Sequence, residues 1–114
     1  KADRRFHQSK FLRRMKLIAI MCLEHCSKNV RNIFKQHDVS VFSELDIRGH
    51  APSKPSSYGW WPSEESLPNY SSMCFALVSD EKAQEIMDGI EKMSKDDESG
   101  HPARAFLLNV ERMI

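Results

Sequence analysis

The sequence lacks the long apolar runs, the glycine- and proline-rich repeats and the paired cysteines that mark several protein classes. Its longest apolar run, residues 17–23, is far shorter than the roughly 18 residues that a membrane-spanning helix needs. Only 4 Gly and 5 Pro occur in 114 residues, which excludes collagen-like and low-complexity chains. The 3 cysteines are an odd number without the spacing of a disulfide framework, which is typical of a reducing compartment. We therefore expect one cytoplasmic domain with no direct membrane insertion.

Charge is distributed unevenly along the chain. Residues 1–14 hold six basic residues and one acidic residue, although the formal net charge of the whole chain is only +1. Residues 15–114 are therefore mildly acidic, which argues against nucleic acid as a partner, because phosphate binding depends on clustered Lys and Arg. We expect residues 1–14 to be a basic N-terminal extension, disordered or foreign to the native chain, and residues 15–114 to form the domain.

Hydrophobic periodicity predicts two halves with the same order of elements, strand, helix, strand. In the first half the apolar run is followed by Ser27, a residue type that caps helices, and Asp80 has the equivalent place in the second half. The expected strands are residues 17–23, 39–47, 73–78 and 103–110, and the expected helices are residues 27–38 and a segment from Asp80 with the apolar stripe Ala83, Ile86, Met87, Ile90 and Met93.

Two such halves in one short chain predict a ferredoxin-like α+β fold. In this fold an antiparallel four-stranded sheet carries both helices on one face. Phe75 and Leu77 on the third strand, together with apolar residues of the first, then form a second apolar face that one copy cannot bury. Association of identical copies is the expected solution.

A long proline- and serine-rich segment, residues 49–72, separates the two halves. Loops beyond about 12–15 residues in a compact domain are usually functional or disordered. This one carries four large aromatic side chains, which either fold the loop back onto the body or dock a partner protein. The candidate docking residues are Tyr58, Trp60, Trp61 and Tyr70.

Several short sequences, collinear over residues 15–114, resemble the nitrogen regulatory P-II (GlnB-like) signal-transduction family, as a divergent member. The order and spacing of these pieces around the long loop carry the resemblance. The pieces are the run at residues 15–20, Val30, Asp46-Ile47-Arg48-Gly49 before the loop, Val78-Ser79-Asp80-Glu81, Ile90, and Phe106-Leu107-Leu108-Asn109-Val110-Glu111.

The resemblance implies a homotrimer that binds ATP, ADP or AMP in clefts between subunits and docks a T-loop onto a transporter or enzyme. The T-loop would be residues 49–72, and the phosphate-contacting B-loop would be residues 97–104. Arg104 stands where the family has a phosphate-binding lysine, and an arginine can hold phosphate through two N–H groups. Pro102 departs from the glycine-rich B-loop because it offers no N–H. The implied ligand-binding residues are Arg48, Gly49, Gly100, His101 and Arg104.

A cluster of cysteine and histidine after the first strand supports a second hypothesis. Cys22, His25 and Cys26 are spaced C-x-x-H-C, and thiolate and imidazole are ligands that suit zinc or copper. The alternative function is thus a trimeric metal-binding protein linked to heavy-metal handling, with a divalent metal ion as cofactor. The competing interpretation is that the cysteines are small buried hydrophobes.

No enzymatic constellation is evident. Cys26 lies near a helix start beside His25, but no orienting Asp and no oxyanion element accompany them, so we expect no enzyme. The acidic runs at residues 64–65 and 96–98 are interpreted as solvated surface. An RNA-recognition module is excluded, because residues 72–78 contain one aromatic and no basic side chain.

Overall fold

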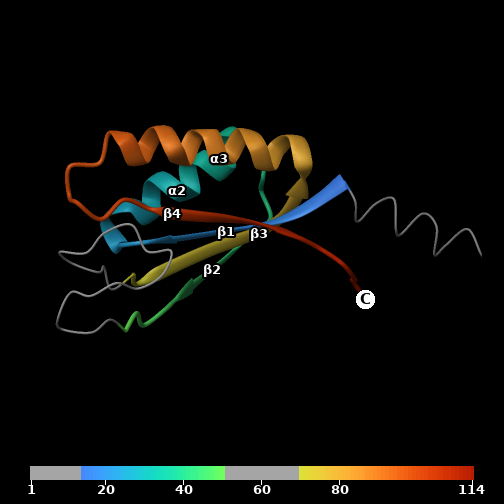
Figure 1. Cartoon of the computed structure of the whole chain (residues 1–114), viewed down its shortest axis with the longest axis horizontal. Coiled ribbons are helices and arrows are strands. Elements are labelled where there is room, and N and C mark those ends of the chain that lie inside the picture. The colour runs from blue at the N-terminus through green and yellow to red at the C-terminus, as the bar shows by residue number, and fades with distance from the viewer. Residues whose placement is uncertain (1–13, 51–69) are drawn as a thin grey trace, which may run out of the picture.

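The computed structural model describes residues 14–50 and 70–114 of the chain. The strands in these residues are β1 (Met15–Cys22), β2 (Ser43–Asp46), β3 (Ser72–Ser79) and β4 (Arg104–Asn109), and the helices are α2 (Glu24–Gln36) and α3 (Asp80–Lys95). All neighbouring strands are antiparallel, in the order β2-β3-β1-β4. Both helices lie on the same side of the sheet (Figure 1). The predicted ferredoxin-like arrangement is confirmed.

The core lies between the sheet and the two helices. Alternate residues of β1 and β3 point into it, because side chains of a strand alternate between its two faces. Both helices are amphipathic, and neither is long and apolar enough to cross a membrane. Side chains that are completely shielded from solvent are Ile18, Ile20, Cys22, Val30, Phe34, Cys74, Ala83 and Ile86.

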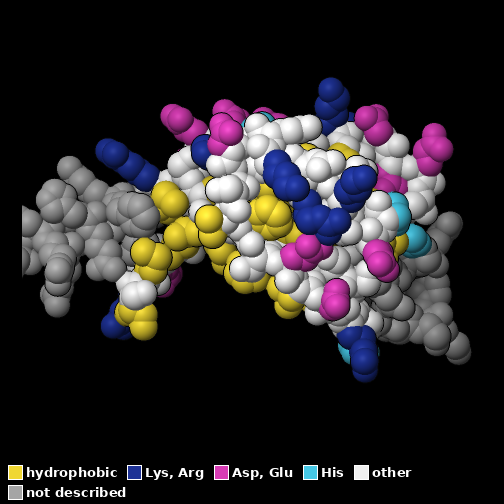
Figure 2. All heavy atoms as spheres, turned by 180° about the vertical axis from the view of Figure 1, so that it is seen from behind, with side chains coloured by type: hydrophobic (Ala, Val, Ile, Leu, Met, Phe, Trp, Pro, Cys, Tyr) yellow, Lys and Arg dark blue, Asp and Glu magenta, His cyan; other side chains and the backbone are white. Residues whose placement is uncertain are grey.

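The opposite face of the sheet is also apolar. Register places Leu17, Leu77 and Leu108 side by side across three strands, and Ala19 lies beside Phe75 and Phe106 one pair further along. In the described residues no helix covers this face (Figure 1). Figure 2 shows hydrophobic side chains gathered on the side of the molecule away from the helices. We call this surface the open face; it consists of Leu17, Ala19, Met21, Leu45, Met73, Phe75, Leu77, Phe106 and Leu108.

Both helices are capped earlier than predicted: α2 begins at Glu24, before Ser27, and α3 begins at Asp80 with Ser79 as its cap. Leu23 is the N-cap of α2 and makes no side-chain cap, while Ser27 lies inside the helix and donates to the carbonyl of Glu24 at 2.8 Å. Cys26 and Ser27 in this first turn are both buried, at 4% and 8% exposed. Ser79, not Asp80, caps α3 by accepting a hydrogen bond from the amide of Lys82 at 3.3 Å. Asp80 lies in the first turn of α3 with Glu81, where their negative charge complements the helix dipole.

The second strand is much shorter than predicted. Only Ser43–Asp46 pairs with β3, whereas the sequence predicted a strand over residues 39–47. After α2 the chain turns through Asp38, whose φ is 60°, and the amide of Val39 bonds back to the carbonyl of Phe34. Phe42 then stacks on Phe34 with ring centroids 4.9 Å apart. Val39 and Phe42 therefore pack on the helix and the core rather than on a strand, whereas Val41 between them is exposed.

The third and fourth strands lie within one residue of their predictions. β3 begins at Ser72, which the sequence assigned to the long loop, and β4 ends at Asn109.

Two valines test the placement of the core. Val78 is 4% exposed beneath the helices and Val41 is 85% exposed. Val78→Ala should lower the free energy of unfolding by about 2 kcal/mol, because it removes two buried methyl groups and leaves a cavity. Val41→Ala should change it by less than about 0.5 kcal/mol. Denaturant midpoints measure both; equal effects of the two substitutions would contradict the position of the core.

Candidate functional site

One end of the sheet gathers most of the residues that the sequence singled out. β1 and β2 end there and β3 and β4 begin there, since Cys22 and Asp46 both pair with Ser72, and Met21 pairs with Arg104. The β1–α2 junction, both described ends of the β2–β3 connection and the α3–β4 connection therefore meet at this end, on the left in Figure 1. We call it the loop end.

Backbone and side-chain hydrogen bonds hold the segments of the loop end together. The amide of Ile47 donates to the carbonyl of Ser71 at 2.9 Å, and the amide of Ser71 donates to that of Cys22 at 3.2 Å. The hydroxyl of Tyr70 donates to the carbonyl of Pro102 at 2.7 Å. The start and the finish of the long connection are thus fixed to each other and to the segment before β4.

Tyr70 is an anchor rather than a docking residue. It is 4% exposed, and burial raises the pKa of its phenol while the neighbouring Arg104 lowers it. This burial corrects the sequence prediction that Tyr70 faces a partner. Tyr58, Trp60 and Trp61 lie outside the described residues.

The predicted ligand-binding residues all lie at the loop end. Arg48 is exposed and Gly49 half-buried just after β2. Gly100 has a φ of 81°, a conformation that favours glycine, and so turns the chain toward β4. His101 is half-buried, and its Nδ1 is a buried atom without a hydrogen-bond partner in the described part of the chain. Arg104, the first residue of β4, is half-buried.

A group of three possible metal ligands lies at the same end. His25, Cys26 and Asp97 each offer one atom, and the three atoms lie within 4.8 Å of one another. Asp97 Oδ2 is 3.6 Å from His25 Nε2, and the Cys26 thiol donates to the same oxygen at 3.6 Å. The side chain of His25 is 50% exposed and that of Asp97 is 9% exposed. We call this group the His–Cys–Asp cluster.

The two acids of the cluster differ in their protonation. Burial, and then the hydrogen bond to Asp97, raise the pKa of the Cys26 thiol to about 11, so the thiol keeps its proton at neutral pH. Hydrogen bonds from Ser99 lower the pKa of Asp97, with smaller contributions from Cys26 and His25. Asp97 is thus a carboxylate that accepts hydrogen bonds from its neighbours.

The structure does not bring Cys22 to the cluster, although the sequence grouped it with His25 and Cys26. Its side chain is completely buried in the core, opposite Ser72 and close to Cys74. Burial, followed by the neighbouring cysteines, raises the pKa of the Cys22 thiol to about 11, and burial raises that of Cys74 similarly. Cys22 and Cys74 therefore act as small core residues.

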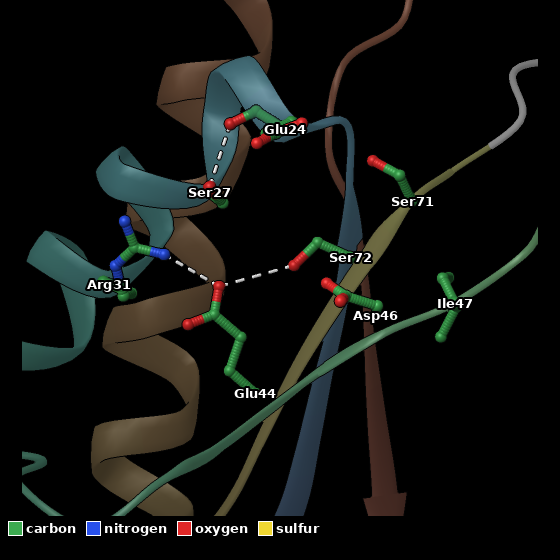
Figure 3. Close-up of a pocket in the computed structure, with 8 residues that line it drawn as sticks. All are labelled: Glu24, Ser27, Arg31, Glu44, Asp46, Ile47, Ser71 and Ser72. Carbon is green, nitrogen blue, oxygen red and sulfur yellow. Dashed lines mark hydrogen bonds and ion pairs between the residues drawn. The ribbon is translucent and has the colours of Figure 1, made fainter.

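A polar hollow of about 490 Å³ opens between the start of α2 and the edge of the sheet (Figure 3). Glu44 points into it and accepts hydrogen bonds from Arg31 at 2.8 Å and from Ser72 at 3.5 Å. Glu24 and Asp46 also line it, so three carboxylates face one guanidinium. This excess of negative charge disfavours a phosphate group in the hollow.

Asp97 is the residue of the cluster that sequence reasoning missed. Its acidic run was interpreted as solvated surface, and it is 71 positions from Cys26, so no local motif joins them. The predicted fold could have indicated the contact with Asp97, because β1 and β4 are adjacent and antiparallel in it. The segment after β1 must therefore lie beside the segment before β4.

Comparisons with known proteins agree on the fold. No family model and no curated protein matches the chain. CPII, a nitrogen regulatory PII-like protein from Thiomonas intermedia K12 solved with ADP, AMP and bicarbonate, is 15% identical, with a TM-score of 0.56 over 89% of this chain and 96% of that chain. A candidate PII-like signalling protein from Thermus thermophilus is 18% identical, with a TM-score of 0.55 over 84% and 86%. A functionally unknown protein from Pediococcus pentosaceus is 14% identical, with a TM-score of 0.59 over 89% and 96%. The chain has the fold of the PII-like signalling proteins.

Proposed function

We propose that the protein is a cytoplasmic PII-like regulator rather than an enzyme. In this proposal three copies associate, an adenine nucleotide binds between neighbouring copies, and its presence governs how residues 49–72 dock onto a transporter or enzyme. The observation that carries the proposal is the loop end. It combines the predicted ligand-binding residues with the two described ends of the β2–β3 connection. A ligand bound there would therefore touch the segments that position this connection.

The open face supports the association of identical copies. A contiguous apolar surface of this kind marks an interaction site, and Leu45 and Leu108 on it are 40% and 45% exposed. In a closed ring of identical chains, the open faces of the copies can cover one another. The trimer is the assembly that the P-II resemblance implies.

The chemistry of the loop end supports a phosphorylated ligand. Arg48 and Arg104 supply fixed positive charge, and Gly100 leaves the backbone open to close approach. CPII, with the same fold, is described with ADP and AMP bound. The acidic hollow beside β2 is unsuited to phosphate, so the proposed phosphate position lies on the Arg104 side of the loop end.

The nucleotide would act by shifting a population of loop states. A ligand changes an equilibrium only by the difference in its affinity for the two states. ATP, ADP and AMP differ in phosphate charge, so they would differ in contacts with Arg104 and His101. A partner that selects one state of residues 49–72 would then respond to the nucleotide that is bound.

The open face predicts an oligomer in solution. Sedimentation should give about three times the 13.2 kDa mass of one chain. Phe75→Glu should shift the chain to monomers, because a charge cannot be buried in an apolar contact without a partner. Val41→Glu, at an exposed position outside the open face, should leave the assembly intact. A monomeric native chain would remove the trimer from the proposal.

Nucleotide binding is the direct test of the loop end. Calorimetric titration with ATP, ADP and AMP should show saturable binding at about one nucleotide per chain. Arg104→Ala should weaken it by about tenfold to a hundredfold, the value of a charge-assisted hydrogen bond, and Arg104→Lys by less. Arg31→Ala is the matched control, because Arg31 is paired with Glu44 in the acidic hollow. Absence of heat at millimolar nucleotide would reject the nucleotide and leave the fold unaffected.

The tryptophans of the long connection are the predicted docking residues. Replacing both Trp60 and Trp61 with Ala should abolish capture of the transporter or enzyme partner, because aromatic anchors carry much of the energy of an interface. Nucleotide titration and sedimentation should be unchanged. Retained capture by an intact trimer would assign docking to other residues.

A further inference from the structure

We propose that His25, Cys26 and Asp97 bind a zinc ion through the imidazole Nε2, the thiolate and the Oδ2 of the carboxylate. None of its three ligands is among the five predicted nucleotide-binding residues, although Asp97 is the first residue of the segment that the resemblance assigns to phosphate contact. The site does not rest on the proposed function. It replaces the ligand set that the sequence predicted, with Asp97 in the place of Cys22.

The spacing of the three donor atoms fits one tetrahedral ion. Zinc bonds of ordinary length to sulfur, nitrogen and oxygen place such donors about 3.4–3.6 Å apart. Asp97 Oδ2 is 3.6 Å from both His25 Nε2 and Cys26 Sγ, and no pair in the cluster exceeds 4.8 Å. The third pair, His25 and Cys26, lies within 4.8 Å, and the imidazole is 50% exposed rather than locked in the core.

Asp97 is held with one oxygen toward the cluster. Its other oxygen, Oδ1, accepts hydrogen bonds from the amide of Ser99 at 2.7 Å and from the hydroxyl of the same residue. This leaves Oδ2 to face His25 and Cys26. Hydrogen bonds of this kind, made to a ligand by groups that do not touch the metal, orient the ligands of metal sites in proteins.

The donor set selects the metal. A thiolate, an imidazole and a carboxylate together suit zinc, whereas magnesium and calcium take oxygen ligands and copper(I) takes softer sulfur ligands. On binding, the thiol proton leaves to solvent as the zinc–sulfur bond forms, and zinc keeps its oxidation state. Three protein ligands leave a fourth position for water, toward a surface hollow of about 420 Å³ that the cluster helps to line.

Zinc at this place would join two segments that are distant in sequence. His25 and Cys26 belong to the first turn of α2, and Asp97 follows α3, three residues before Gly100. The ion would therefore fix the connection that leads into β4. In the structure these side chains are linked by the Cys26–Asp97 hydrogen bond and by the 3.6 Å contact between His25 Nε2 and Asp97 Oδ2.

The test uses the full chain, reduced and stripped of metal, titrated with zinc against a chromophoric chelator. About one zinc per chain should bind, and Cys26→Ser, Asp97→Asn and His25→Gln should each lower the affinity at least tenfold. Cobalt(II) should give a thiolate-to-cobalt charge-transfer band that Cys26→Ser abolishes and Cys22→Ala retains. X-ray absorption of the zinc form should show a single sulfur ligand.

His37→Gln is the matched control, because His37 Nδ1 is paired with Glu85 at 3.2 Å without a nearby thiol. It should bind zinc like the native chain. Circular dichroism checks that each variant folds. If Cys26→Ser fails to fold, Asp97→Asn still tests the proposal. Equal zinc affinity in Asp97→Asn and the native chain, two sulfur ligands, or a preference for copper(I) would each overturn the site as proposed. Zinc binding without nucleotide binding would support the zinc site and reject only the proposed function.

Discussion

The structure depends on a single constraint: β1 and β3, the two central strands, carry apolar side chains on both of their faces. Because side chains alternate along a strand, neighbouring positions serve two different surfaces at once. The set toward the helices includes the small residues Cys74 and Ala76, which let helices approach closely, whereas the other set includes Phe75 and Leu77. A shift of register by one residue would exchange the two sets, and this difference in size specifies the correct register.

Strand order then determines where the candidate site residues gather. In the order β2-β3-β1-β4, the connections that carry the predicted ligand-binding residues and the His–Cys–Asp cluster reach the same end of the sheet. Tyr70 and Asp97, from two of these connections, are both fixed there by hydrogen bonds. A nucleotide and a metal ion would thus share a neighbourhood without sharing ligands. Occupation of one site would bear on the other through the segment between Asp97 and Arg104.

The sequence predicted the elements well, because periodicity and the length of apolar runs report directly on burial. It failed where a contact between distant segments decides the outcome. Ser27 is a good capping residue, yet α2 begins at Glu24 and buries Ser27 inside its first turn, and Phe42 packs on Phe34 rather than extending β2. In the candidate site, a motif of close spacing suggested Cys22, whereas alternation along β1 sends that side chain into the core. The partner that replaces it, Asp97, follows from strand order and not from any local pattern.

The short second strand has a consequence for the solubility of the chain. β2 lies at an edge of the sheet, it is four residues long, and all of its side chains are exposed, with Glu44 and Asp46 among them. Short, charged edge strands resist the addition of further strands, which is the usual route to fibrous aggregates. A chain with an apolar sheet face is thereby protected against uncontrolled edge-to-edge growth along β2. The proposed association of copies would then use the open face, where a closed assembly leaves no free surface for further copies.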